Sequence, residues 1–195
     1  MEFNMFHNRP LWQRGRYITL LSSRENNPFD IWEAKEGEGR IAKIYDHTLK
    51  CRVIAIIGDN ICPTYITCPS DPRYTLGIPY PHLIFSIKYL KNPFTLEILV
   101  LDNEGIRRTL RYDNDHHETE IEEYRCIKSI FLGAGWNILQ IDLADTTAGA
   151  FETTYVETLQ VQIHAHLKVR TVYFSKRSLS DDVFPKEFRH AYIEC

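Results

Sequence analysis

The stretch "TLQVQIHAHLKVRTVYFS", Thr158 to Ser175, decides the fold class because its residues alternate in polarity. From Leu159 to Val169 every odd-numbered residue is apolar, and every even-numbered residue from Gln160 to Arg170 is polar. Successive side chains of a β-strand point to opposite faces of its sheet. The pattern therefore predicts a strand with one face buried and the other in water.

The alternation changes register near the end of this stretch. Val172 and Phe174 are apolar but even-numbered, and a shift of one residue moves the apolar side chains of a strand to its other face. We therefore expect a turn or a bulge between about Ala165 and Thr171. A second hairpin at this point fits the pattern.

Three further stretches have the aliphatic, aromatic and alternating character of strands: Leu96 to Leu101, Ile106 to Tyr112, and Trp136 to Leu143. Between the first two lies "DNEG", Asp102 to Gly105, whose glycine tolerates the positive φ of a tight turn. These two strands are therefore predicted to form a β-hairpin.

Helical signals are few. The segment "LADTTAGAF", residues 143–151, predicts one or two helical turns with Asp145 or Thr146 as the N-cap. The segment "FPKEFRHAY", Phe184 to Tyr192, predicts a short helix that begins with Pro185. Neither segment is long enough to build a helical core.

Short strands joined by proline- and glycine-rich connections predict an all-β fold, an antiparallel jelly-roll-like β-sandwich with one or two short helices. The chain of 195 residues is 44% hydrophobic, which is enough for one sizeable core. Because no repeat or linker interrupts the sequence, we expect residues 1–195 to form a single domain with a core from roughly Met5 to Ile193.

The composition limits the compartment and the class of partner. No apolar stretch approaches the roughly 20 residues that cross a bilayer, and Met1 to Gln13 lacks the apolar segment of a secretory signal. We therefore expect an intracellular protein without membrane contact. The five cysteines are odd in number and scattered, which argues against a disulfide framework.

Two groups of residues superficially suggest catalysis or metal binding. His164 and His166 would share one strand face, yet Lys168 and Arg170 on the same face oppose a divalent cation, so no metal site is expected. The acidic stretch Asp113 to Glu123 has the composition of a solvated loop. Nucleotide-binding and hydrolase motifs are absent, and we expect neither a cofactor nor enzymatic activity.

The connection "TYITCPSDPRYTLGIPYP", Thr64 to Pro81, is rich in proline and tyrosine. Each proline fixes φ and lowers the entropy lost when the loop becomes ordered. We expect the prolines to hold Tyr65, Tyr74 and Tyr80 in place for packing or for a partner. The segment is thus predicted to brace the fold and to present a surface.

Basic residues gather on two predicted strands, with Arg107, Arg108 and Arg111 on one and Lys168 and Arg170 on the other. Arg107 and Arg111 share a strand face that carries no apolar residue between them, so that face is not core. Such a group is either a solvated surface or a contact to an acidic protein, because guanidinium groups bind carboxylates in bidentate pairs.

Long blocks of the chain resemble one known family. The blocks "TYITCPSDPRYTLGI", "FTLEILVLDNEGIRRTLR", "GWN" and "YVETLQVQIHAHLKVRTVYFS", with "IW" at Ile31 and Trp32, are similar to the cilia- and flagella-associated protein 20 family. The blocks occur in order and cover nearly the whole chain. This resemblance implies a jelly-roll-like β-sandwich without enzymatic activity.

The resemblance also implies a cellular role. Members of the family lie at the inner junction of axonemal doublet microtubules in motile cilia. There they help to close the B-tubule onto the A-tubule by binding tubulin and neighbouring junction or luminal proteins. The expected localisation is therefore the axoneme of the cilium or flagellum, with basal body, centriole and nucleus as further sites.

The chain departs from the family's pattern in its charges. The family's paired arginines are replaced at Ala148 and Gly149, and Glu152 adds a negative charge. The typical member is basic, whereas the pI of this sequence is about 6.2, so long-range attraction to acidic tubulin should be weaker. The acidic stretch Glu118 to Glu123 would repel tubulin. We interpret the chain as a divergent paralogue.

The residues expected to contact an acidic partner are five cation donors and two aromatic anchors: Arg107, Arg108, Arg111, Lys168, Arg170, Tyr65 and Tyr74.

Two other functions are open. Jelly-roll sandwiches also serve as carbohydrate- or small-ligand-binding modules, but Trp12, Trp32 and Trp136 are too scattered in the sequence to predict a binding platform. Nucleic-acid binding would use the basic strands and the tyrosines. It conflicts with the formal net charge of −3.

Overall fold

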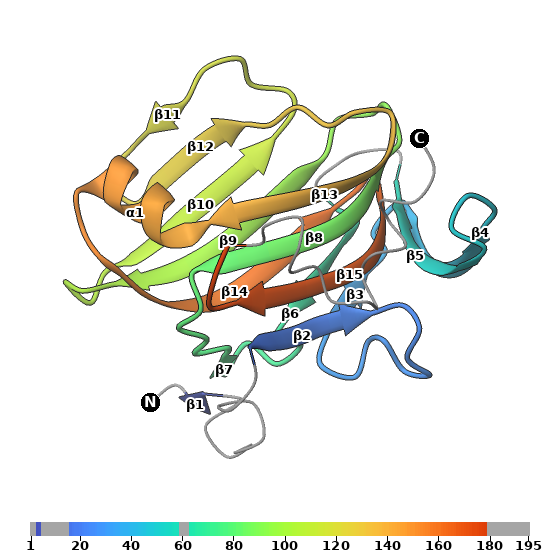
Figure 1. The fold of residues 1–195 in the computed structure, drawn as a ribbon, viewed down its shortest axis with the longest axis horizontal. Coiled ribbons are helices and arrows are strands. Elements are labelled where there is room, and N and C mark those ends of the chain that lie inside the picture. Colours follow the sequence, from blue (N-terminus) through green and yellow to red (C-terminus); the bar gives the residue numbers. More distant parts are fainter. Residues whose placement is uncertain (1–2, 5–15, 59–62, 179–195) are drawn as a thin grey trace.

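The computed structural model describes residues 3–4, 16–58 and 63–178, and two β-sheets pack face to face in it (Figure 1). The predicted all-β sandwich is therefore confirmed. One sheet has seven strands in the order β11-β12-β10-β9-β14-β6-β3. Their bounds are Glu120–Ile121 (β11), Arg125–Ser129 (β12), Arg107–Asp113 (β10), Thr95–Asp102 (β9), Tyr155–His164 (β14), Tyr65–Cys68 (β6) and Glu33–Lys35 (β3).

The other sheet has six strands, in the order β13-β8-β15-β5-β4 with β2 pairing along β15. Their bounds are Gly135–Asp142 (β13), His82–Tyr89 (β8), Leu167–Ser175 (β15), Cys51–Ile57 (β5), Arg40–Asp46 (β4) and Tyr17–Ser22 (β2). The short strands β1 (Phe3–Asn4) and β7 (Tyr74–Thr75) pair separately. Most pairings are antiparallel, as predicted, but β10 with β12 and β1 with β7 are parallel.

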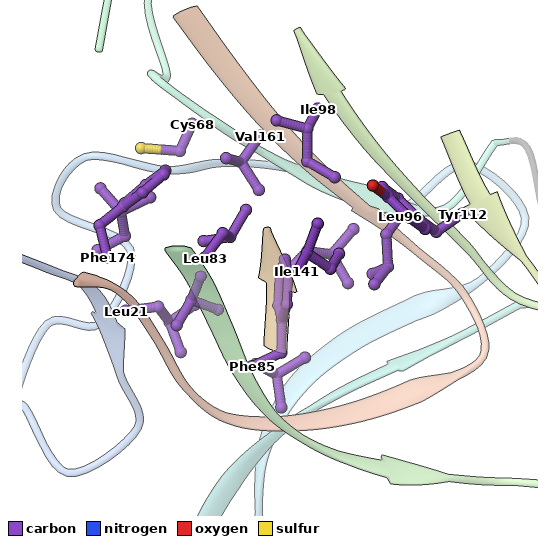
Figure 2. Close-up of a cluster of buried hydrophobic side chains, with 14 of the residues drawn as sticks. Leu21, Cys68, Leu83, Phe85, Leu96, Ile98, Tyr112, Ile141, Val161 and Phe174 are labelled. Carbon is purple, nitrogen blue, oxygen red and sulfur yellow. The ribbon is translucent and has the colours of Figure 1, made fainter. Parts of the chain in front are cut away.

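The main hydrophobic core fills the space between the two sheets (Figure 2). Ile98 and Val161 enter it from the seven-stranded sheet, and Leu83, Phe85 and Phe174 enter it from the other sheet. All five side chains are fully buried. Burial of aliphatic and aromatic side chains contributes about 1.5–3 kcal/mol each to stability.

The predicted hairpin is confirmed as β9 and β10, which pair antiparallel across the turn at Asp102 to Gly105. Asp102 is 2% exposed, and its Oδ1 accepts the N–H groups of Glu104 and Ile106. Gly105 has φ +76°, the conformation for which glycine was predicted. The turn therefore fixes where β10 begins.

The stretch from Thr158 to Ser175 forms parts of two strands in different sheets. β14 pairs with β9 and β6, whereas β15 pairs with β8, β5 and β2. The chain bends at Ala165 and His166 and crosses between the sheets. A register shift also lies in β15 before Thr171. The predicted change of register is confirmed, but the hairpin is wrong because β14 and β15 do not pair with each other.

The helix α1 (Leu143–Phe151) follows β13 directly. Its N-cap is Asp142, whose side chain accepts the N–H of Asp145 at 2.9 Å, so the prediction of Asp145 or Thr146 as the cap is wrong. Thr146 lies inside α1 and is buried, and its Oγ1 accepts a hydrogen bond from the hydroxyl of Tyr112 at 3.0 Å. The predicted helix at residues 184–192 lies outside the described residues.

The nine residues of α1 are too few to cross a bilayer, and no helix in the described ranges is long and apolar enough to do so.

The proline-rich connection braces the sandwich, as predicted. Leu76 and Ile78 are buried, and their N–H groups donate to the carbonyls of Leu159 and Thr158 in β14. The hydroxyl of Tyr155 donates to the carbonyl of Ile78 at 2.8 Å. The connection is thereby hydrogen-bonded to the first half of β14, the strand that pairs with both β6 and β9 in the seven-stranded sheet.

Candidate partner-binding surfaces

Arg107 and Arg111 lie on the outer face of the seven-stranded sheet, where the sequence placed them. Arg107 is exposed. The Arg111 Nε donates to Asp113 Oδ2 at 3.0 Å, and its Nη1 lies 3.5 Å from Glu97 Oε1. The charge of Arg111 is therefore compensated within the chain.

Arg108 is a buried structural residue, which corrects its assignment as a surface cation. It is 6% exposed, and its Nε donates to Asp102 Oδ2 at 2.8 Å. Its Nη1 donates to the carbonyl of Glu123, and its guanidinium carbon lies 4.8 Å from the ring centroid of Phe151 in α1. Arg108 thus joins the β9–β10 turn, the β11–β12 connection and the helix.

Lys168 lies on the outer face of the six-stranded sheet beside Lys88. Both ammonium groups lie 3.3 Å from Asp46 Oδ2, and Trp136 Nε1 donates to Asp46 Oδ1 at 3.2 Å. Burial by itself raises the pKa of Asp46. This effect is outweighed by hydrogen bonds from the Leu49 N–H, Trp136 and Lys168 and by the charge of Lys88, and the pKa is lowered to about 2. The carboxylate is therefore ionised at neutral pH, and its two lysines leave one net positive charge.

Arg170 is also buried, at 2% exposure, so its assignment as a surface cation is corrected as well. It lies at the register shift between Val169 and Thr171, where the regular alternation of β15 is interrupted. Burial and the charge of Arg24 both lower the pKa of its guanidinium.

The two predicted aromatic anchors reach the surface in part. The ring of Tyr65 packs against His164 with centroids 5.0 Å apart, and Lys35 Nζ lies 5.8 Å from the Tyr65 centroid. Tyr74 is 37% exposed in β7. Tyr80 instead packs inside the fold at 6% exposure.

A group of basic residues that sequence reasoning missed lies on both faces of the β4–β5 hairpin, with Arg40 and Ile57 on one face and Lys43, Tyr45 and Arg52 on the other. We call this group the basic end. It consists of four cations and two exposed apolar side chains: Arg40, Lys43, Lys50, Arg52, Tyr45 and Ile57. The sequence signal was present, because residues 40–52 contain four basic side chains and a single acidic one. That acidic side chain is Asp46, which already binds Lys88 and Lys168.

An acidic surface covers the β11–β12 hairpin. We call it the acidic end. It also combines four charges with two exposed apolar side chains: Glu118, Glu120, Glu122, Glu123, Ile121 and Tyr124. The prediction of a solvated stretch holds for these glutamates. Asp113 differs, because it is 1% exposed and accepts from Arg111 and His116.

Among the described residues, the histidines and tryptophans singled out in the sequence do not come together as a ligand site. His164 ends β14 and His166 lies in the bend after it, so the two do not share a strand face as predicted. Among the described residues, no group of three or more His, Cys, Asp or Glu side chains is arranged to hold a metal ion. Trp32 is 3% exposed and donates to the carbonyl of Leu20. Trp12 lies outside the described residues.

A family model for the CFA20 domain matches residues 5–192 of the chain, which is almost its full length. The chain belongs to the CFA20 domain family. The family resemblance predicted from the sequence blocks is therefore confirmed.

Relatives of this CFA20-domain chain are named cilia- and flagella-associated protein 20. The protein of Chlamydomonas reinhardtii is 40% identical over 173 residues, which cover 89% of this chain and 91% of the relative. The protein of Paramecium tetraurelia has the same identity and coverage. The protein of Caenorhabditis elegans is 35% identical over 185 residues, which cover 95% of this chain and 90% of the relative.

Among solved structures, the family 11 carbohydrate-binding module of the Clostridium thermocellum cellulase Lic26A-Cel5E is similar with a TM-score of 0.42. Its sequence is 10% identical, and the match covers 85% of this CFA20-domain chain and 97% of the module. This distant likeness indicates no ligand for the present chain.

Proposed function

We propose that this chain is a non-enzymatic structural protein of the ciliary or flagellar axoneme. It binds tubulin and neighbouring proteins at the inner junction of doublet microtubules and thereby supports the stability and motility of the cilium. The observation that carries the proposal is the match to the CFA20 domain over residues 5–192, together with relatives named as cilia- and flagella-associated proteins. Because the matches span nearly all of both chains, they concern the whole fold.

Such a role requires surfaces that complement a partner. Arg107 is exposed on the outer face of one sheet, and Lys88 and Lys168 surround Asp46 with one net positive charge on the other. Cations of this kind bind acidic groups of a partner. Tyr65 and Tyr74 supply partly exposed aromatic surface, which is common in interfaces.

Co-sedimentation of the full chain with taxol-stabilised microtubules across a salt series tests the proposal. We expect binding at low salt that weakens as salt screens the charges. Arg107→Glu should weaken the binding. Arg73→Glu is the matched control, because Arg73 is an exposed arginine of the β6–β7 connection whose charge is paired with Asp71.

Arg111 is unsuitable for this test. A carboxylate at its position would stand beside Asp113 and Glu97, and the resulting repulsion would destabilise the sheet. If the wild-type chain does not sediment with microtubules even at low salt, direct tubulin binding is wrong. If Arg107→Glu and Arg73→Glu bind like the wild type, Arg107 has no part in the contact.

A further inference from the structure

We propose that the outer edge of β13 and the inner face of the β11–β12 hairpin together bind an extended segment of a partner protein as an added strand. The segment that fits alternates apolar residues with lysine or arginine. In this mode of recognition main-chain hydrogen bonds supply affinity and alternate side chains supply specificity. The inference does not rest on the proposed axonemal function.

β13 offers backbone hydrogen-bonding groups along its outer edge. It pairs with β8 alone among the described strands, and the N–H of Leu143, in the same register, donates to the carbonyl of Pro81. Bonded and non-bonded pairs alternate along an antiparallel ladder, so the even-numbered residues of β13 direct their N–H and C=O groups away from β8. In the described part of the chain, no residue bonds the backbone of Trp136 or Ile138 on that side.

β13 also lacks the features by which edge strands avoid pairing with other chains, which include short length, charged side chains and proline. β11 and β3 have only two and three residues, and β4 carries Arg40 and Lys43. β13 has eight residues without lysine, arginine or proline, and its one charged side chain, Asp142, caps α1. Its edge is therefore open to an added strand.

Beside this edge, the inner face of the β11–β12 hairpin exposes apolar surface. Ile121 is paired with Cys126, which is buried in the main core, and paired residues lie on the same face of a sheet. Ile121 therefore lies on the inner face, yet it is 55% exposed. Tyr124 is 54% exposed, and its ring centroid lies 6.0 Å from the guanidinium carbon of the buried Arg108.

The exposure of Ile121 follows from the unequal widths of the two sheets. In Figure 1 β11 and β12 extend beyond β13, and no described strand of the six-stranded sheet lies in front of them. A strand added to β13 would continue the six-stranded sheet across this uncovered face and would bury apolar surface there. We call the outer edge of β13 and the uncovered inner face the edge slot.

The charges beside the edge slot select the composition of the added strand. In the described part of the chain, no lysine or arginine forms an ion pair with Glu118, Glu120 or Glu123 of the acidic end. These carboxylates favour a positively charged segment. Since alternate residues of a strand share a face, apolar residues at every second position would meet Ile121 and Tyr124 while the basic residues between them face away.

A second copy of the chain does not fit the edge slot through its own β13. Antiparallel pairing of two identical strands relates the copies by a two-fold axis at the centre of the pair. The β11–β12 hairpin of each copy would then lie behind the other copy's β13, where that copy's own seven-stranded sheet stands. The edge slot therefore has room for a single strand and not for a second sandwich.

Fluorescence anisotropy of a labelled peptide with the full chain tests the proposal. The probe is a peptide of about nine residues in which valine and lysine alternate, a length that matches an ordinary strand. We expect saturable binding to the wild-type chain. The same peptide with glutamate in place of lysine should bind at least about tenfold more weakly, because its charges repel those of the acidic end.

Two substitutions at one position isolate the backbone contribution. Ile138→Pro removes an N–H that points to the outer edge and leaves the ladder with β8 in place, since proline is tolerated at such positions of an edge strand. Ile138→Ala shortens the same side chain and keeps the N–H. The proline variant should bind the valine–lysine peptide at least about fivefold more weakly than the alanine variant, because a main-chain hydrogen bond is lost.

Ile121→Lys tests the apolar face and should also weaken binding, because it replaces apolar surface by a charge of the same sign as the peptide. Val156→Lys is its matched control, since Val156 is 41% exposed in β14 and lies outside the edge slot. This control should bind like the wild type. Circular dichroism confirms that each variant is folded.

A wild-type chain that does not bind the valine–lysine peptide would overturn the proposal. So would equal affinities of the Ile138→Pro and Ile138→Ala variants, or a valine–glutamate peptide that binds as tightly as the valine–lysine one. If sedimentation equilibrium shows a wild-type dimer that Ile138→Pro dissociates and Ile138→Ala does not, the edge binds a second copy of the chain and the proposed occupant is wrong.

Discussion

β14 and β15 follow each other in the chain, yet they are buried differently. In β14 the inward side chains from Leu159 to Ile163 are buried, while Gln160, Gln162 and His164 stay half-buried on the outer face. In β15 every residue except Lys168 is buried. Alternating polarity therefore persists only in the strand whose sheet has one face in water.

The cause lies on the outer face of the six-stranded sheet. Ile84 and Tyr173 form a second, small hydrophobic cluster there, with Tyr17 and Ile138 packed against it. The rings of Tyr17 and Tyr173 meet edge to face at 5.9 Å between centroids. β15 therefore has apolar neighbours on both faces, and its sequence from Val172 to Phe174 is continuously apolar.

The largest difference between the two strands should appear on truncating an outward side chain. Tyr173→Ala in β15 removes a ring that is 1% exposed and should cost about 3–5 kcal/mol of unfolding free energy. Gln162→Ala in β14 should change it by less than about 0.5 kcal/mol. Urea denaturation measures both. Similar losses in the two variants would mean that the outer faces do not differ in burial.

A smaller effect on stability is expected at the carboxylate that pairs with Lys168, the outward charged side chain of β15. The pKa of Asp46, the partner of Lys168, is lowered from 3.8 to about 2. Its ionisation therefore contributes about 2 kcal/mol of stability above pH 4, and the contribution is lost as the pH falls toward 2. Asp46→Asn should remove this contribution, so its free energy of unfolding should fall less between pH 4 and 2 than that of the wild type. Urea denaturation at each pH measures both. An equal fall in Asp46→Asn and the wild type would contradict this assignment.

The smallest effect is expected at the ion pair on the outer face of the other sheet. Glu97 lies 3.5 Å from Arg111 and 3.9 Å from His164, with 31% of its side chain exposed. Glu97→Gln should cost less than about 1 kcal/mol, and added salt should reduce the cost further. A loss as large as that of Asp46→Asn would show that exposure does not separate the two sites.

Local patterns in the sequence were sufficient for the fold class and for the hairpin at Asp102 to Gly105. The same strand parity that placed Arg107 and Arg111 outward also puts Arg108 on the opposite face, beside Leu110. Its burial could therefore have been predicted from β10 alone. The cap at Asp142 could also have been predicted from the sequence, because Asp is a favoured N-cap residue and Asp142 directly precedes α1.

Other features depend on contacts between distant residues. Asp46 meets Trp136 and Lys168 across separations of 90 and 122 residues, and no local pattern specifies such a pairing. The register shift at which the buried Arg170 lies depends on the partners of β15 in its sheet. The four cations of the basic end are local in the sequence, within residues 40–52, and only the contacts of Tyr45 with Arg52 and of Ile57 with Arg40 depend on the pairing of β4 with β5.

The β4–β5 hairpin lies at the right of Figure 1 and β11 at the upper left, so the opposite charges of the basic end and the acidic end contribute to an electric dipole of the molecule. A dipole experiences a torque in an electric field, and the field near a negatively charged wall points into that wall. The charges of the two ends therefore favour an approach to such a wall with the β4–β5 hairpin in front, and this preference acts during diffusion, before any side chain makes contact.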